Sequence, residues 1–105
     1  MTVLPASGSL KLAAAPLAAG ETRTLIDDAG YQTLLMRVEA GPLGTLHDHD
    51  KIEQIYVIEG DFYDDEESYQ AGDVVVRMPG AMHRAGSRNG CTMLITYMPF
   101  VEARP

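Results

Sequence analysis

The chain has 105 residues of one continuous composition, which favours a single domain. It carries 8 basic and 15 acidic residues, a formal net charge of −7, which argues against non-specific binding to nucleic acid or to an anionic membrane. The single cysteine, Cys91, excludes an intramolecular disulfide. The sequence has no run of 18 apolar residues, which a membrane-spanning helix would require, so we expect a cytoplasmic protein.

The first 20 residues are rich in alanine and leucine. The apolar stretch Leu10–Ala19 has no basic segment before it and is interrupted by Pro16. A secretory signal peptide requires such a basic segment. We therefore expect residues 1–20 to form an N-terminal arm and residues 21–105 to form one domain.

The remaining sequence predicts many short strands separated by Gly, Pro and Asp turns. No segment has a convincing apolar repeat of 3.6 residues, as a helix would require. This pattern is typical of an all-β sandwich or barrel. The strands that we expect are Thr22–Asp27, Tyr31–Glu39, Glu53–Ile58, Ser68–Ala71, Val74–Val76 and Cys91–Tyr97, with turns at Asp28–Gly30, Gly60–Asp61, Gly72–Asp73 and Pro79–Gly80.

The expected strand Glu53–Ile58 is apolar on both faces. Ile55 and Val57 share one face, and Tyr56 and Ile58 share the other. We therefore predict that a second subunit covers the outer face in a homodimer. The alternative is that the N-terminal arm covers it.

Five acidic residues lie within Asp61–Glu67. The segment lacks the spaced Asp/Asn pattern and the central Gly of an EF-hand loop. We interpret it as a solvated turn.

All three histidines fall into one pattern with a glutamate. His47 and His49 stand two apart, so on a strand they share a face, and Glu53 has the same odd-numbered phase. His83 follows a Pro-Gly turn and could complete the set from another strand. A lone histidine is more often a surface or core residue, but this cluster favours a site for Fe²⁺, Mn²⁺, Zn²⁺, Ni²⁺ or Cu²⁺.

Two segments resemble the two cupin motifs. From Gly41 to Gly60 the sequence has Gly, five residues, His-x-His, three residues, Glu, six residues and Gly, which fits the first motif at every spacing. The second segment, Gly72 to His83, keeps Gly80 and the histidine but has Met78 where the motif has Pro, and Ser87 stands where Asn is frequent. The resemblance implies a small antiparallel β-barrel of the cupin or jelly-roll type, the double-stranded β-helix. It also implies one metal ion per chain held by His47, His49, Glu53 and His83.

Three further segments resemble the cupins related to the ChrR anti-sigma factor and to acetylacetone-type dioxygenases: Glu59–Glu66, Tyr69–Asp73 and Pro79–Ser87. ChrR proteins carry a separate helical sigma-binding domain, for which we expect no room here, so the resemblance does not imply sigma-factor sequestration. The dioxygenases bind iron through three histidines, whereas the matching Glu53 resembles four-ligand sites.

Four other residues each allow two interpretations. Arg77 lies in an apolar strand and could bind a substrate carboxylate or enolate through its guanidinium fork, or extend to water. Tyr56 and Tyr97 could donate to a bound ligand, with burial in the wall favoured. Cys91 fits a packed core thiol better than a nucleophile, because no histidine remains to activate it.

The function that we predict is that of a metal-dependent enzyme on a small molecule, of dioxygenase type. Fe²⁺ or Zn²⁺ is the expected ion, with Mn²⁺ and Ni²⁺ as alternatives. No acid, base or nucleophile stands out beyond the metal ligands. The alternative is a non-catalytic module that senses or binds a metal or a metabolite.

Overall fold

The structure, a computed structural model, describes residues 17–46, 50–80 and 83–100. These residues contain strands and turns, and no helix that could span a membrane was found among them; the location of the protein in the cell stays a prediction. The eight strands are β1 (Thr22–Asp28), β2 (Tyr31–Val38), β3 (Gly41–Leu46), β4 (Lys51–Asp64), β5 (Ser68–Gln70), β6 (Val74–Arg77), β7 (His83–Ser87) and β8 (Cys91–Pro99).

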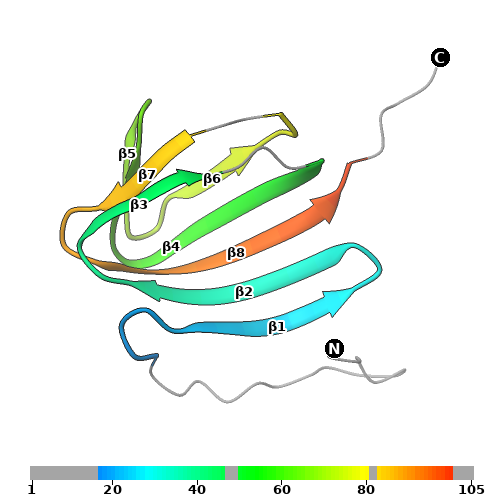
Figure 1. Cartoon of the computed structure of the whole chain (residues 1–105), viewed down its shortest axis with the longest axis horizontal. Helices are drawn as coiled ribbons and strands as arrows, with labels where there is room; N and C mark the ends of the chain where they lie inside the picture. The colour runs from blue at the N-terminus through cyan, green and yellow to red at the C-terminus, as the bar shows by residue number, and fades with distance from the viewer. Residues whose placement is uncertain (1–16, 47–49, 81–82, 101–105) are drawn as a thin grey trace.

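The strands form two antiparallel layers that share β4. The first layer, which we call sheet A, has the order β1-β2-β8-β4, with β6 also paired to β4. The second layer, sheet B, contains β3, β7, β5 and the last part of β4. The layers meet where β4 bends, and Figure 1 shows them curled into a half-barrel. The expected all-β antiparallel barrel architecture is confirmed.

The bend of β4 corrects one predicted turn. The sequence pattern placed the end of a strand at Gly60–Asp61, but β4 continues to Asp64. The register shifts between Val57 and Glu59, and Gly60 has a φ of 83°, a conformation that favours glycine. A side chain at Gly60 would also collide with the carbonyl oxygen of Gly90. Glycine therefore lets the strand cross from sheet A to sheet B without reversing.

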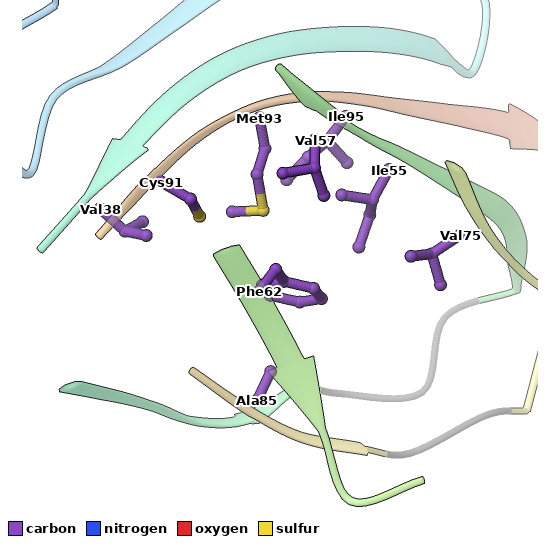
Figure 2. Packing of buried hydrophobic residues seen from close by; sticks show 9 residues of the cluster. All are labelled: Val38, Ile55, Val57, Phe62, Val75, Ala85, Cys91, Met93 and Ile95. Atoms are coloured by element: carbon purple, nitrogen blue, oxygen red, sulfur yellow. The ribbon is translucent and has the colours of Figure 1, made fainter. Parts of the chain in front are cut away.

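The core lies between the two layers. Cys91 is 4% exposed within it, so the prediction of a packed thiol is confirmed. Burial raises the pKa of this thiol, and a hydrogen bond with Ser87 opposes the shift only in part. Figure 2 shows the cluster that these side chains form: Val38, Ile55, Val57, Phe62, Val75, Ala85, Cys91, Met93 and Ile95.

The outer face of sheet A is exposed in the single chain. On β4, Ile55 and Val57 are buried, but Tyr56 and Ile58 on the other face are each 43% exposed. The outer face of this strand is therefore exposed in the described part of one chain, and its cover by a second subunit or by the N-terminal arm stays a prediction. Of the predicted arm, only residues 17–20 are described, and Leu17 is buried there. Whether residues 1–20 form a separate arm stays a prediction.

Candidate metal centre

Two of the four predicted ligands are described, and both lie at one end of the space between the layers. Glu53 is 8% exposed and shares the inward face of β4 with Ile55. His83 begins β7, and its side chain is 12% exposed. His47 and His49 lie outside the described residues. We call the region around Glu53 and His83 the open end, and the region where β4 bends the closed end.

Arg77 lies at the open end and is buried. It is 7% exposed, so its side chain does not extend to water as one of its two readings required. Its Nη1 lies 3.1 Å from Oε1 of Glu53, and its Nη2 lies 2.7 Å from Oδ2 of Asp64. The guanidinium also lies over the ring of Phe62, 5.8 Å from the centroid. Arg77 thus connects two carboxylates that come from the two halves of β4.

Asp64 accepts four hydrogen bonds, which corrects the interpretation of Asp61–Glu67 as a solvated turn. Its Oδ1 accepts from the amides of Glu66 and Glu67, and its Oδ2 accepts from Tyr69 and Arg77. Burial alone would raise the pKa of Asp64, but these hydrogen bonds outweigh it and hold the pKa below its usual value. Asp64 is therefore an ionised, buried anchor at the end of β4.

Two tyrosines contact the same carboxylates. Burial raises the pKa of Tyr69 to about 12, and its hydrogen bond to Asp64 adds to the shift. Burial also raises the pKa of Tyr97, and a hydrogen bond to Glu53 adds to it. Both hydroxyls therefore stay protonated at neutral pH and act as donors.

The orientation of His83 is set by a carboxylate. Its Nδ1 lies 3.2 Å from Oδ1 of Asp65, whose side chain is 53% exposed. An ionised carboxylate only accepts hydrogen bonds, so Nδ1 carries the proton in this pair. The Nε2 of a neutral ring then keeps a free electron pair, as in histidines that bind a metal and donate their other nitrogen to a carboxylate.

Asp64, Asp65 and His83 offer ligand atoms that all lie within 4.8 Å of one another. Because both oxygens of Asp64 already accept two hydrogen bonds each, we interpret Asp64 as a support and not as a ligand. The sequence pattern missed Asp64, Asp65 and Tyr69. Their signal was hidden in an acidic run, since only the fold shows which of those acids face inward.

The described groups fit a cation. Among the described residues, two buried carboxylates, those of Glu53 and Asp64, share one buried guanidinium, that of Arg77. Burying unbalanced charge is costly, and a divalent ion beside Glu53 would offset it. An open pocket of about 190 Å³ lies beside Asp64, Arg77 and His83, and Val75 and Met78 also line it.

The fold and this arrangement define a cupin. The structure is similar to a cupin-2 domain containing protein from Shewanella frigidimarina, at 25% identity and a TM-score of 0.60, with 80% of this chain and 84% of that chain covered. It is also similar to an RmlC-like cupin protein from Desulfovibrio desulfuricans, at 19% identity and a TM-score of 0.69, with 90% and 98% covered. A chain in the complex of Rhodobacter sphaeroides SigE with the anti-sigma ChrR matches at 19% identity and a TM-score of 0.66, with 73% and 44% covered.

Residues 11–101 match the family model of the ChrR Cupin-like domain. The chain belongs to this family, and the expected cupin fold is confirmed. No curated protein matched the sequence.

Proposed function

We propose that this chain is a metal-binding cupin that holds one divalent transition metal ion through His47, His49, Glu53 and His83 and acts on a small molecule. The observation that supports the proposal is a connected set of charged side chains: Arg77 bridges Glu53 to Asp64, and Asp64 lies within 4.8 Å of His83 and Asp65. Leu46, the last described residue before His47, pairs with His83.

Fe²⁺ and Zn²⁺ are the ions that we propose first, with Mn²⁺ and Ni²⁺ as alternatives, because imidazole and carboxylate donors suit all four. Such an ion supplies Lewis acidity when bound, and iron adds redox chemistry with O₂. The chain supplies the rest: buried Glu53 and the oriented His83 fix the donors, and Val75 and Met78 give the adjoining pocket an apolar wall. A dioxygenase-type reaction is the enzymatic class that we propose.

The experiment is elemental analysis of the purified protein together with an oxygen-consumption screen. Small molecules with two neighbouring oxygen atoms are the first substrates to test. Bound iron with turnover, both lost in His83→Ala, would support the enzyme. A wild-type protein that binds no transition metal, as purified or after reconstitution, would contradict the proposal.

The second candidate is a non-catalytic module that senses or binds a metal or a metabolite. It is favoured by the likeness to a chain of the SigE complex with the anti-sigma ChrR, of which this chain covers 44%. Tight zinc without turnover in the same experiment would favour this candidate over the enzyme.

The contact of Arg77 with a substrate stays a prediction. Nη1 and Nη2 already donate to protein carboxylates, and the buried Nε has no hydrogen-bond partner among the described residues. A substrate carboxylate would therefore bind at Nε alone or displace Glu53 or Asp64.

We also propose that the protein is a homodimer in which a second copy covers the outer face of sheet A. A row of apolar side chains crosses four strands there: Leu35, Leu94, Tyr56 and Val74. Val74 is 58% exposed in the single chain. Light scattering tests this: a mass near 11.4 kDa would contradict the dimer, and Val74→Lys should convert a dimer into that monomer.

A further inference from the structure

Arg77 ties together two residues that stand at opposite ends of the same strand. Glu53 lies near the start of β4 in sheet A, and Asp64 is the last residue of β4 in sheet B. Because β4 bends between the layers, these carboxylates come to face each other, and Arg77 from β6 donates to both. The guanidinium is planar and presents its donors in fixed directions, so it sets the separation of the two carboxylates.

Both ends of this bridge are fixed from the other side. Asp64 is held by the amides of the following turn and by Tyr69. Glu53 also accepts a hydrogen bond from Tyr97 on β8. The Glu53 carboxylate therefore meets a donor from each of two neighbouring strands, and its Oε1 is occupied by Arg77 at 3.1 Å.

We propose that Arg77 is a positioning residue that fixes Glu53 for the metal ion, and not the residue that binds the substrate. This inference rests on the proposed metal site. Arg77 donates to Oε1 of Glu53, and this contact would hold the carboxylate in place for the ion. Outer partners of this kind commonly change metal affinity by about 10- to 100-fold. Lysine retains the positive charge but is a point donor that cannot bridge both carboxylates, so Arg77→Lys separates geometry from charge.

The experiment measures the affinity of Zn²⁺ and Co²⁺ for the whole chain by competition with a chromophoric chelator. The variants are Arg77→Lys, Glu53→Gln and the double variant. Arg88→Lys is the matched control. Like Arg77, Arg88 lies over an aromatic ring, that of Tyr63, but it is exposed and donates to the hydroxyl of Ser68 instead of to a carboxylate. We expect Arg77→Lys to weaken binding at least tenfold, Arg88→Lys to leave it unchanged, and the double variant to bind no more weakly than Glu53→Gln alone. The absorption spectrum of bound Co²⁺ should change alike in Arg77→Lys and Glu53→Gln.

Two results would overturn the inference while leaving the metal site intact. One is an Arg77→Lys affinity within twofold of wild type. The other is a loss of metal affinity on Arg77→Lys that is as large in the Glu53→Gln background as in the wild type. Arg77 would then affect metal binding independently of Glu53. Failure of the wild type to bind either ion would instead overturn the proposed function, and the inference with it.

If Arg77→Lys does not fold, Tyr97→Phe provides a second test of whether Glu53 is held in place. This change removes one hydroxyl from the same carboxylate without altering charge. It should weaken binding several-fold, and only in the presence of the Glu53 carboxylate. An unchanged affinity in Tyr97→Phe would count against a fixed Glu53.

Discussion

The two ends of the barrel interior are built from the same strand but from opposite kinds of residue. Along the inward face of β4, the charged Glu53 is followed by Ile55 and Val57, and after the bend Phe62 is followed by the charged Asp64. The closed end is apolar and packed, whereas the open end holds buried charge. Inward-facing side chains of β4 can therefore be either charged or apolar, and their position along the strand determines which.

The two ends also differ in how they contribute to stability. Apolar groups at the closed end stabilise the fold by leaving water. A buried ion pair is commonly no more stabilising than apolar residues of the same size. The charges of Glu53, Arg77 and Asp64 at the open end are therefore not required for stability, which agrees with the proposed metal site.

Metal binding at the open end should have the largest effect on stability. Because ligands that bind only the native state add stability, an ion present at 1,000 times its dissociation constant should contribute about 4 kcal/mol. We expect the melting temperature to fall when a chelator removes the ion, and His83→Ala to show no such dependence. The measurement is thermal melting with metal content checked before and after chelation. An unchanged melting temperature after confirmed removal would mean that the open end does not bind a stabilising ion.

A core truncation at the closed end should have the next largest effect. Met93 is 1% exposed, and Met93→Ala should cost about 3 kcal/mol of unfolding free energy through lost contacts and a cavity. Met78→Ala is the control, since Met78 is 52% exposed and its truncation should cost less than about 0.5 kcal/mol. Chemical denaturation gives both values. If folded Met93→Ala lost its metal, the two ends would not be separable.

The local sequence pattern predicted six of the eight strands in the described part of the chain, and the two missed strands show which information the pattern lacks. The segment Gly41–Leu46 contains Gly41, Pro42 and Gly44, which carry no alternation of apolar and polar side chains. His83–Ser87 reads His-Arg-Ala-Gly-Ser, which is also without alternation. These strands form because they pair with each other across some 40 residues of sequence. The strand propensity of a short segment carries no information about such a long-range contact.

The candidate ligands could be proposed from the sequence, but the side chains that support them could not. The spacing of the cupin motifs marks Glu53 and His83, because those positions are fixed within short segments. The partnership of Arg77 with Glu53 depends on the register of β6 against β4, and that with Asp64 depends on the bend of β4. Both are long-range features, so the sequence could only indicate that Arg77 was an unusual charge in an apolar strand.

Asp61 is a polar residue at the closed end, and we expect it to stabilise the fold without affecting metal binding. Its carboxylate accepts from the amides of Arg88 and Asn89, the side chain of Asn89 and the hydroxyl of Ser87. These bonds connect β4 to the turn before β8, so Asp61→Asn should cost about 2 kcal/mol at neutral pH without changing metal affinity. Chemical denaturation and metal titration measure the two quantities, and exposed Asp27→Asn is the control.

The same variant predicts a pH dependence. Burial alone would raise the pKa of Asp61, but the hydrogen bonds outweigh it and lower the pKa. A carboxyl whose pKa is lower in the folded state adds stability above its unfolded value of about 3.9, and this is lost as the pH falls through the folded value. The stability difference between wild type and Asp61→Asn should therefore be largest near neutral pH and shrink below about pH 4. A constant difference from pH 7 to pH 3 would contradict this role of the charge.

The smallest effect that we expect concerns the exposed partner of His83. Asp65→Ala removes the acceptor at 3.2 Å from Nδ1, so the ring can turn and Nε2 is no longer held unprotonated toward the open end. The Asp65 side chain is 53% exposed, so water can replace it. Among residues that hydrogen-bond to metal ligands its loss should therefore have a small effect, about tenfold in metal affinity or about 1.4 kcal/mol. Glu66→Ala is the matched control, because its backbone amide and not its side chain holds Asp64. Competition titration with Zn²⁺ measures both variants. Equal affinity of Asp65→Ala and wild type would mean that His83 is oriented by its strand alone, and the division between the two ends would then rest on Glu53 and Arg77.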